Sequence, residues 1–169
     1  MTDIVIRREG EIYVADWGAS ARRCSVGRGA VALKQREGDG ITPIGVWDLR
    51  NVLYRPDRGP APKTALPLAP LSANDGWCEA PDDPDYNRMV RLPHRAASDS
   101  LWRGDGLYDV VLVVGYNDAP VVKGRGSAIF VHVARENYGP TEGCVGLARA
   151  DLEEALAQLA PGDKLIVKA

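Results

Sequence analysis

Short hydrophobic runs, separated by glycine and proline turns, follow one another along most of the chain. The clearest are IYVADW (12–17), GAVALK (29–34), IGVWDL (44–49), VVLVVG (110–115) and AIFVHV (128–133). Runs of this length, rich in β-branched residues and bounded by turn formers, predict a mainly β domain. Because side chains alternate along a strand, we expect Phe130 and His132 on one face of AIFVHV and Val131 and Val133 on the other.

One segment near the carboxyl terminus has helical spacing instead. In ARADLEEALAQLA (148–160), Leu152, Leu156 and Leu159 recur at about the helical period, and Asp151 supports the amino-terminal end. Pro161 and Gly162 end the predicted helix, and KLIVKA (164–169) predicts a closing strand.

Residues 55–85 hold seven of the twelve prolines and few periodic hydrophobic positions. They predict a long surface excursion that shapes a binding site, and not a second domain. The 169 residues, 45% of them hydrophobic, are enough for one domain over 1–169.

The charge balance of the chain indicates which class of partner is not expected. The chain has 21 basic and 23 acidic residues with no dense basic run, so no nucleic-acid partner is expected.

The sequence also bears on membrane insertion and export. The apolar runs are of strand length, so no membrane span is expected. Acidic residues at positions 3, 9 and 11 exclude a signal peptide in the sequence as written, which favours a cytoplasmic location.

Cysteines occur at 24, 78 and 144, an odd number at irregular spacing. This pattern indicates neither a disulfide framework nor a CxxC metal site. For Cys24 and Cys78 we expect small buried or idle thiols.

No metal or other cofactor is predicted. His94 lies in a polar segment and is expected to be solvated. A nearby acidic run has the composition of a cation site, but a solvated turn is the preferred interpretation: Asp82, Asp83 and Asp85.

Cys144 and His132 are the candidate catalytic pair. A thiol is a weak nucleophile until a base takes its proton, and the turn-rich segment ARENYGPTEG lets the chain fold back to bring the two together. We expect the amides of Gly143 and Cys144 to stabilise an oxyanion, and the following helix to lower the thiol pKa. The alternative is a buried structural cysteine beside a hydrogen-bonded histidine.

FVHVAR (130–135) followed by PTEGCVGL (140–147), with DGITPIGVWDL (39–49) upstream, resembles the catalytic domain of the YkuD-type L,D-transpeptidases. The family's histidine falls on His132, and its Ser/Thr, Gly and Cys fall on Thr141, Gly143 and Cys144. Its TPxG element falls on residues 42–45.

The resemblance implies a β-sandwich or distorted barrel and a cysteine peptidyltransferase that acts on peptidoglycan stem peptides or muropeptides. Cys144 would form a thioester with the donor and release its terminal residue, and an amine acceptor would complete the transfer. His132 would act as general base and acid, oriented by a backbone carbonyl near Val133. The family also implies work in the periplasm or cell wall.

Two positions depart from the family. Glu142 stands where many members have histidine, and Gly146 stands where many have Arg or Asn. We expect these departures to change substrate contacts more than catalysis.

Two segments, 74–93 and 136–141, are expected to line the substrate cleft. The predicted substrate contacts are Tyr86, Arg88, Asn137, Tyr138 and Thr141, with the guanidinium suited to a stem-peptide carboxylate.

Three functions follow in order. Transpeptidation comes first. An L,D-carboxypeptidase or amidase with the same Cys and His is second, because water then replaces the amine. A non-catalytic protein that binds wall fragments is third.

Overall fold

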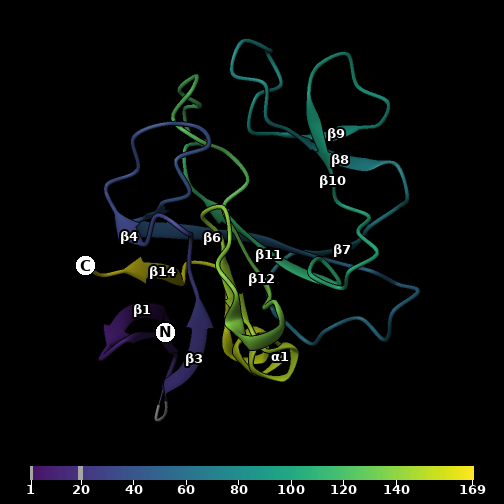
Figure 1. Cartoon of the computed structure of the whole chain (residues 1–169). Coiled ribbons are helices and arrows are strands. Elements are labelled where there is room, and N and C mark those ends of the chain that lie inside the picture. Colours follow the sequence, from purple (N-terminus) through teal and green to yellow (C-terminus); the bar gives the residue numbers. More distant parts are fainter. Residues whose placement is uncertain (1, 19–20) are drawn as a thin grey trace.

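The computed structural model describes residues 2–18 and 21–169, and strands dominate it (Figure 1). The main sheet runs in the order β11-β12-β13-β3-β2-β1-β14-β6, and β6 also pairs with β11. That last pairing closes the sheet into a barrel. Its strands are β1 (Ile4–Glu9), β2 (Ile12–Asp16), β3 (Ala21–Ser25), β6 (Gly45–Tyr54), β11 (Val110–Gly115), β12 (Phe130–Val133), β13 (Val145–Leu147) and β14 (Lys164–Val167). The mainly β, barrel-like prediction is confirmed.

Parallel and antiparallel pairs both occur in the barrel. β1 with β14 and β12 with β13 are parallel, and the other barrel pairs are antiparallel. In the parallel pair β12 and β13, His132 lies opposite Gly146. The register therefore places the predicted base beside the strand that directly follows Cys144.

Strand β11 shows why the barrel has two hydrophobic clusters. Val110, Leu112 and Val114 belong to the large cluster, while Val111 and Val113 belong to a second cluster on the other face. A strand covered on both faces has no polar alternation, which explains the unbroken run VVLVVG. The second cluster contains Phe130 and Cys144, so it forms part of the floor of the site.

The predicted helix is confirmed as α1 (Arg149–Gln158), with Leu152, Ala155 and Leu156 buried in the large cluster. Among the described residues, no helix has the length and apolar character needed to cross a membrane. The predicted strand over 29–34 is mostly wrong. Only β4 (Val31–Ala32) forms there, in parallel with β5 (Thr42–Pro43), because Ala30 turns the chain with a φ of 61°.

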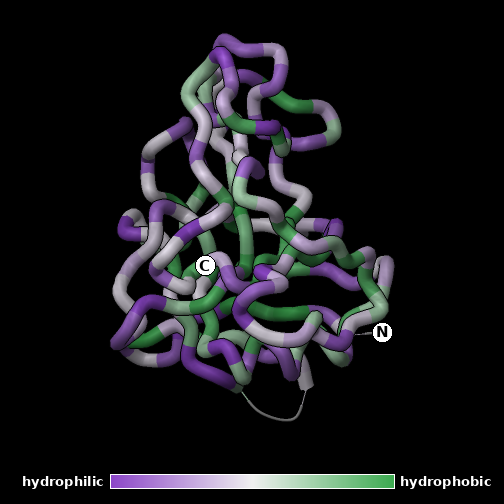
Figure 2. The backbone as a smooth tube through the Cα atoms, turned by 90° about the vertical axis from the view of Figure 1, so that its right-hand side faces the viewer, coloured by the Kyte–Doolittle hydropathy of each residue, from purple (hydrophilic) through white to green (hydrophobic). Residues whose placement is uncertain are grey.

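The predicted excursion is ordered and extends beyond residue 85. It adds β7 (Leu68–Pro70) to β6 and then forms a small sheet in the order β10-β8-β9. These strands are β8 (Asp75–Cys78), β9 (Met89–Arg91) and β10 (Ser98–Ser100). Figure 1 shows the small sheet on the side away from β1 and β14. In Figure 2 the hydrophobic segments gather in the lower body, and the loops above are largely hydrophilic.

Candidate active site

His132 projects from β12 on the face predicted for it, and only 4% of its surface is exposed. Its Nδ1 lies 2.8 Å from the carbonyl oxygen of Val133. A carbonyl oxygen only accepts, so Nδ1 carries the proton, and in the neutral ring Nε2 keeps its lone pair. The carbonyl that the sequence suggested for orienting the ring therefore makes this contact. The edge of Tyr108 packs against the imidazole with ring centroids 5.3 Å apart.

Cys144 directly precedes β13, and its thiol is fixed by backbone groups of the neighbouring segment. Sγ donates to the carbonyl oxygen of Ala128 at 3.0 Å and accepts from the amide of Phe130 at 3.3 Å. Cys144 and His132 line the same pocket, of about 240 Å³. The structure thus brings the predicted nucleophile and base into one cavity.

Burial holds both groups in their neutral forms. Burial and, to a smaller extent, the charges of Arg103 and Arg135 lower the pKa of His132 to about 4, although the hydrogen bond to the Val133 carbonyl opposes this change. Burial raises the pKa of the Cys144 thiol to about 12, although the Phe130 amide opposes this change. The expectation of a lowered thiol pKa is therefore wrong. Helix α1 begins five positions beyond the cysteine, and the effect of a helix dipole falls off within its first turn.

The turn before Cys144 is held by two buried hydroxyls. Thr141 Oγ1 accepts from the Gly143 amide at 3.1 Å and donates to the Cys144 carbonyl oxygen at 2.6 Å. Thr42 Oγ1 accepts from the Gly27 amide and donates to the Gly143 carbonyl oxygen, each at 2.8 Å. The upstream threonine therefore ties the cysteine turn to the loop after β3.

The prediction that Gly143 supplies an oxyanion amide does not hold, because that amide is bound to Thr141. Gly143 has a different role. Its φ is +139°, and a Cβ there would lie 2.9 Å from the carbonyl oxygen of Ile41. The Cys144 amide, in contrast, donates no hydrogen bond within the described ranges 2–18 and 21–169, so of the two predicted donors it is the one without a competing partner.

Gly146 is also explained by packing. A Cβ at this position would collide with the hydroxyl of Ser25 on β3 and would lie 3.0 Å from the Cα of Ala134. The arginine or asparagine of other family members has no room here. If arginine or asparagine contacts the substrate in other family members, a residue at another position must make that contact in this chain.

The predicted substrate residues separate into two groups. Thr141 lines the pocket. Tyr86 does not: it is 1% exposed, and its hydroxyl donates to Glu37 at 2.9 Å and accepts from the Gly126 amide. Arg88 is exposed on a separate hollow beside Met89. A direct contact of Tyr86 or Arg88 with a substrate in this pocket is therefore contradicted.

Asn137 and Tyr138 lie on the short 3-10 helix η1 (Glu136–Tyr138), both with positive φ. Neither lines the Cys144 pocket. The Tyr138 ring packs beneath the guanidinium of Arg23, 4.8 Å from its centroid, and faces another hollow that Pro140 also lines. The local turn was predicted correctly, but it directs these side chains away from the pocket.

The sequence did not reveal the charged lining of the pocket. Three lining residues are cationic and four are acidic: Lys34, Arg103 and Arg135, and Glu37, Glu79, Asp99 and Glu142. Burial raises the pKa of Asp99 and of Glu79. Among these charged residues, only Arg135 could have been placed near the site from the sequence, because it directly follows FVHVA.

Comparisons with known proteins identify the family of the chain. The family described as YkuD, L,D-transpeptidase catalytic domain, matches residues 2–167. No curated protein matches the chain. A solved L,D-transpeptidase from Mycobacterium smegmatis is similar over 99% of this chain and 59% of its own length, with 12% identity and a TM-score of 0.42.

Proposed function

Because the chain belongs to the YkuD family of L,D-transpeptidase catalytic domains, we propose that it transfers peptidoglycan stem peptides through a thioester on Cys144. The observation that carries the proposal is the shared pocket of Cys144 and His132, in which the ring keeps an unprotonated Nε2. The donor would be a tetrapeptide stem, and the acceptor a primary amine of a second stem.

The first half-reaction forms the thioester. His132 Nε2 takes the thiol proton as Sγ bonds to the donor carbonyl carbon, and the Cys144 amide stabilises the oxyanion. The carbon–nitrogen bond then breaks, and His132 returns the proton to the leaving amine. Since the resting groups are both neutral, the proton moves during the attack and no thiolate exists beforehand.

The second half-reaction uses the same groups in reverse. The acceptor amine loses a proton to Nε2 and attacks the thioester carbonyl. The thiolate leaves and regains the proton from His132. Water in place of the amine gives the carboxypeptidase reaction.

The charged lining fits such substrates. Stem peptides carry both carboxylates and amines, and the pocket offers both signs of charge. Arg135 is exposed and forms no ion pair within the described ranges, so we assign it to the donor carboxylate in place of Arg88. Asp99 and Glu79 are assigned to the acceptor ammonium group.

The test is mass spectrometry of protein and products after mixing with a disaccharide tetrapeptide in ¹⁸O-water, with and without an amine acceptor. We expect an acyl adduct on the wild type and a crosslinked product without ¹⁸O. Cys144→Ala should form neither, and Cys24→Ala, which removes a thiol of the barrel core, should form both. Released ¹⁸O-labelled tripeptide alone would favour the carboxypeptidase, and no adduct would favour a binding protein.

A further inference from the structure

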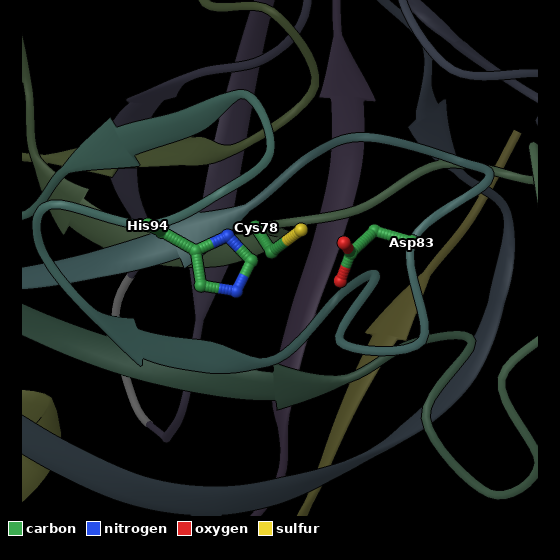
Figure 3. Close-up of side chains that lie close together, drawn as sticks. All are labelled: Cys78, Asp83 and His94. Atoms are coloured by element: carbon green, nitrogen blue, oxygen red, sulfur yellow. The ribbon is translucent and has the colours of Figure 1, made fainter.

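A second cluster with metal-binding side chains lies outside the candidate active site (Figure 3). Cys78 ends β8, Asp83 lies in the turn that follows, and His94 lies in the loop between β9 and β10. One ligand atom from each residue lies within 4.8 Å of the others. The fold thus gathers a thiol, a carboxylate and an imidazole from three segments.

This ligand set suits a borderline transition ion. Thiolate, imidazole and carboxylate together are typical zinc ligands, whereas magnesium and calcium prefer oxygen alone. Ligand atoms around tetrahedral zinc are roughly 3.3–3.8 Å apart. Closing the cluster from 4.8 Å requires a shift of about 1 Å, which side-chain rotations can supply.

His94 already has the hydrogen bonds that orient a metal ligand. Its Nδ1 accepts from the Ala96 amide at 3.1 Å, so Nε2 carries the proton and donates to Asp85 at 3.0 Å. A histidine that donates one ring N–H to a carboxylate and binds metal through its other nitrogen is a recurrent arrangement. Binding through Nδ1 would replace the Ala96 bond and keep the Asp85 bond.

One carboxylate oxygen of Asp83 already accepts hydrogen bonds, and the other does not. Its Oδ1 accepts from the Asp85 amide and from Arg95, both at 2.8 Å. Its Oδ2 accepts no hydrogen bond from the part of the chain that the structure describes. The turn therefore holds the carboxylate in place and leaves an oxygen for an ion.

The three side chains are largely shielded from solvent, but a surface hollow borders the imidazole. Cys78 is fully buried, and the side chains of Asp83 and His94 are each 9% exposed. A surface hollow lined by Asp85, Arg91 and His94 reaches the imidazole from solvent. Such a site holds an ion away from bulk water and still allows its entry.

The surrounding sheet gives the ion a structural purpose. Cys78, Tyr86 and Val90 are buried but belong to neither hydrophobic cluster. A small sheet with little apolar packing is the kind of unit that a metal stabilises. We propose that Cys78, Asp83 and His94 bind one zinc ion, with a fourth position open to water, and that the ion fastens β8 to the loops on either side of β9. Binding displaces the thiol proton of Cys78 into solvent.

Zinc and cobalt titrations test the site directly. The full chain is stripped with a chelator and titrated with Zn²⁺, and Co²⁺ is followed by its absorption spectrum. We expect one ion per chain and a thiolate-to-cobalt charge-transfer band. His94→Gln and Cys78→Ser should weaken binding at least about 100-fold, and Asp85→Asn about 10-fold.

The control is Cys144→Ala, because Cys144 and His132 are a second place where a thiol and an imidazole line one pocket. The proposal requires this variant to bind zinc as tightly as the wild type. Binding that is lost with Cys144→Ala and kept with His94→Gln would overturn the proposal. So would the absence of binding to the wild type. If Cys78→Ser fails to fold, the zinc affinity of His94→Gln tests the proposal, and circular dichroism checks that this variant is folded.

Discussion

The chain holds two cysteine–histidine pairs in different ways. Around Cys144 and His132 the partners are backbone groups: the thiol meets the Ala128 carbonyl and the Phe130 amide, and the imidazole meets the Val133 carbonyl. Around Cys78 and His94 the imidazole meets the Asp85 carboxylate and the Ala96 amide, and the Cys78 thiol forms no hydrogen bond within the part of the chain that the structure describes. Backbone partners hold the Cys144 and His132 side chains in one geometry, which suits a reaction. Side-chain partners can change conformation, which allows Cys78 and His94 to move toward an ion. Residue type alone therefore does not distinguish a nucleophile from a ligand; the surrounding hydrogen bonds do.

Cys144→Ser tests the first pair with the largest expected effect. A hydroxyl in the same place is a far weaker nucleophile at neutral pH, and we expect acyl transfer to fall by at least about 10⁴-fold. Transfer kinetics on the tetrapeptide donor measure this, beside unfolding in urea as a check of stability. Transfer at more than a tenth of the wild-type rate would contradict the role of Cys144.

His132→Gln should reduce transfer on the order of 10² to 10³-fold. The pH profile is more specific. Only the unprotonated ring accepts the thiol proton, and burial lowers its pKa to about 4. The wild-type kcat/KM should therefore stay level as pH falls through 6.5 and decline only as pH approaches about 4. Because kcat/KM reports the free enzyme, an acid limb centred near 6.5 would contradict the buried state of His132 in the free protein.

Thr42→Val tests whether backbone ties hold the first pair. The valine has the same shape but leaves the Gly27 amide and the Gly143 carbonyl without their buried partner. We expect the free energy of unfolding to fall by roughly 2–4 kcal/mol. Urea denaturation measures this, with Thr64→Val as the matched control because its hydroxyl accepts only one local bond, from Leu66. Equal losses in the two variants would mean that the tie is unimportant.

Arg95→Gln tests the side-chain ties of the second pair and has the smallest expected effect. The guanidinium is 59% exposed while it contacts Asp83 and Asp85. Exposed ion pairs contribute little, so the metal-free protein should lose less than about 1 kcal/mol of unfolding free energy. Zinc binding should become tighter, since a competing charge is removed from Asp83. Weaker zinc binding would show that Arg95 positions the carboxylate.

The placement of Cys144 and His132 in one pocket was predictable because its signals are local. The alternation in AIFVHV fixed the face of His132, and the glycine-flanked turn marked Cys144. The substrate contacts were not predictable, because loop side chains have no periodicity. Tyr86 had the composition of a ligand-binding residue, yet its ring is buried beside Glu37 and Gly126.

The thiol pKa was mispredicted for a related reason. The sequence showed a helix after Cys144, but not that Phe130 and the second hydrophobic cluster exclude water from the sulfur. Likewise, the acidic run around Asp83 had the composition of a cation site but was interpreted as a solvated turn, and nothing in the local sequence linked it to Cys78 or His94. Only the folding of the small sheet brings them together.

The order of strands in the barrel has a consequence for biosynthesis. Strand β14 lies between β1 and β6, so residues 4–6 must meet residues 165–167, which lie near the other end of the sequence. Contacts between residues so far apart in sequence form slowly. On the ribosome the ring cannot close until residues 164–167 have left the exit tunnel, and the edges of β1 and β6 stay unpaired until then. Those two edges are where a chaperone or a misfolded neighbour would bind the nascent chain.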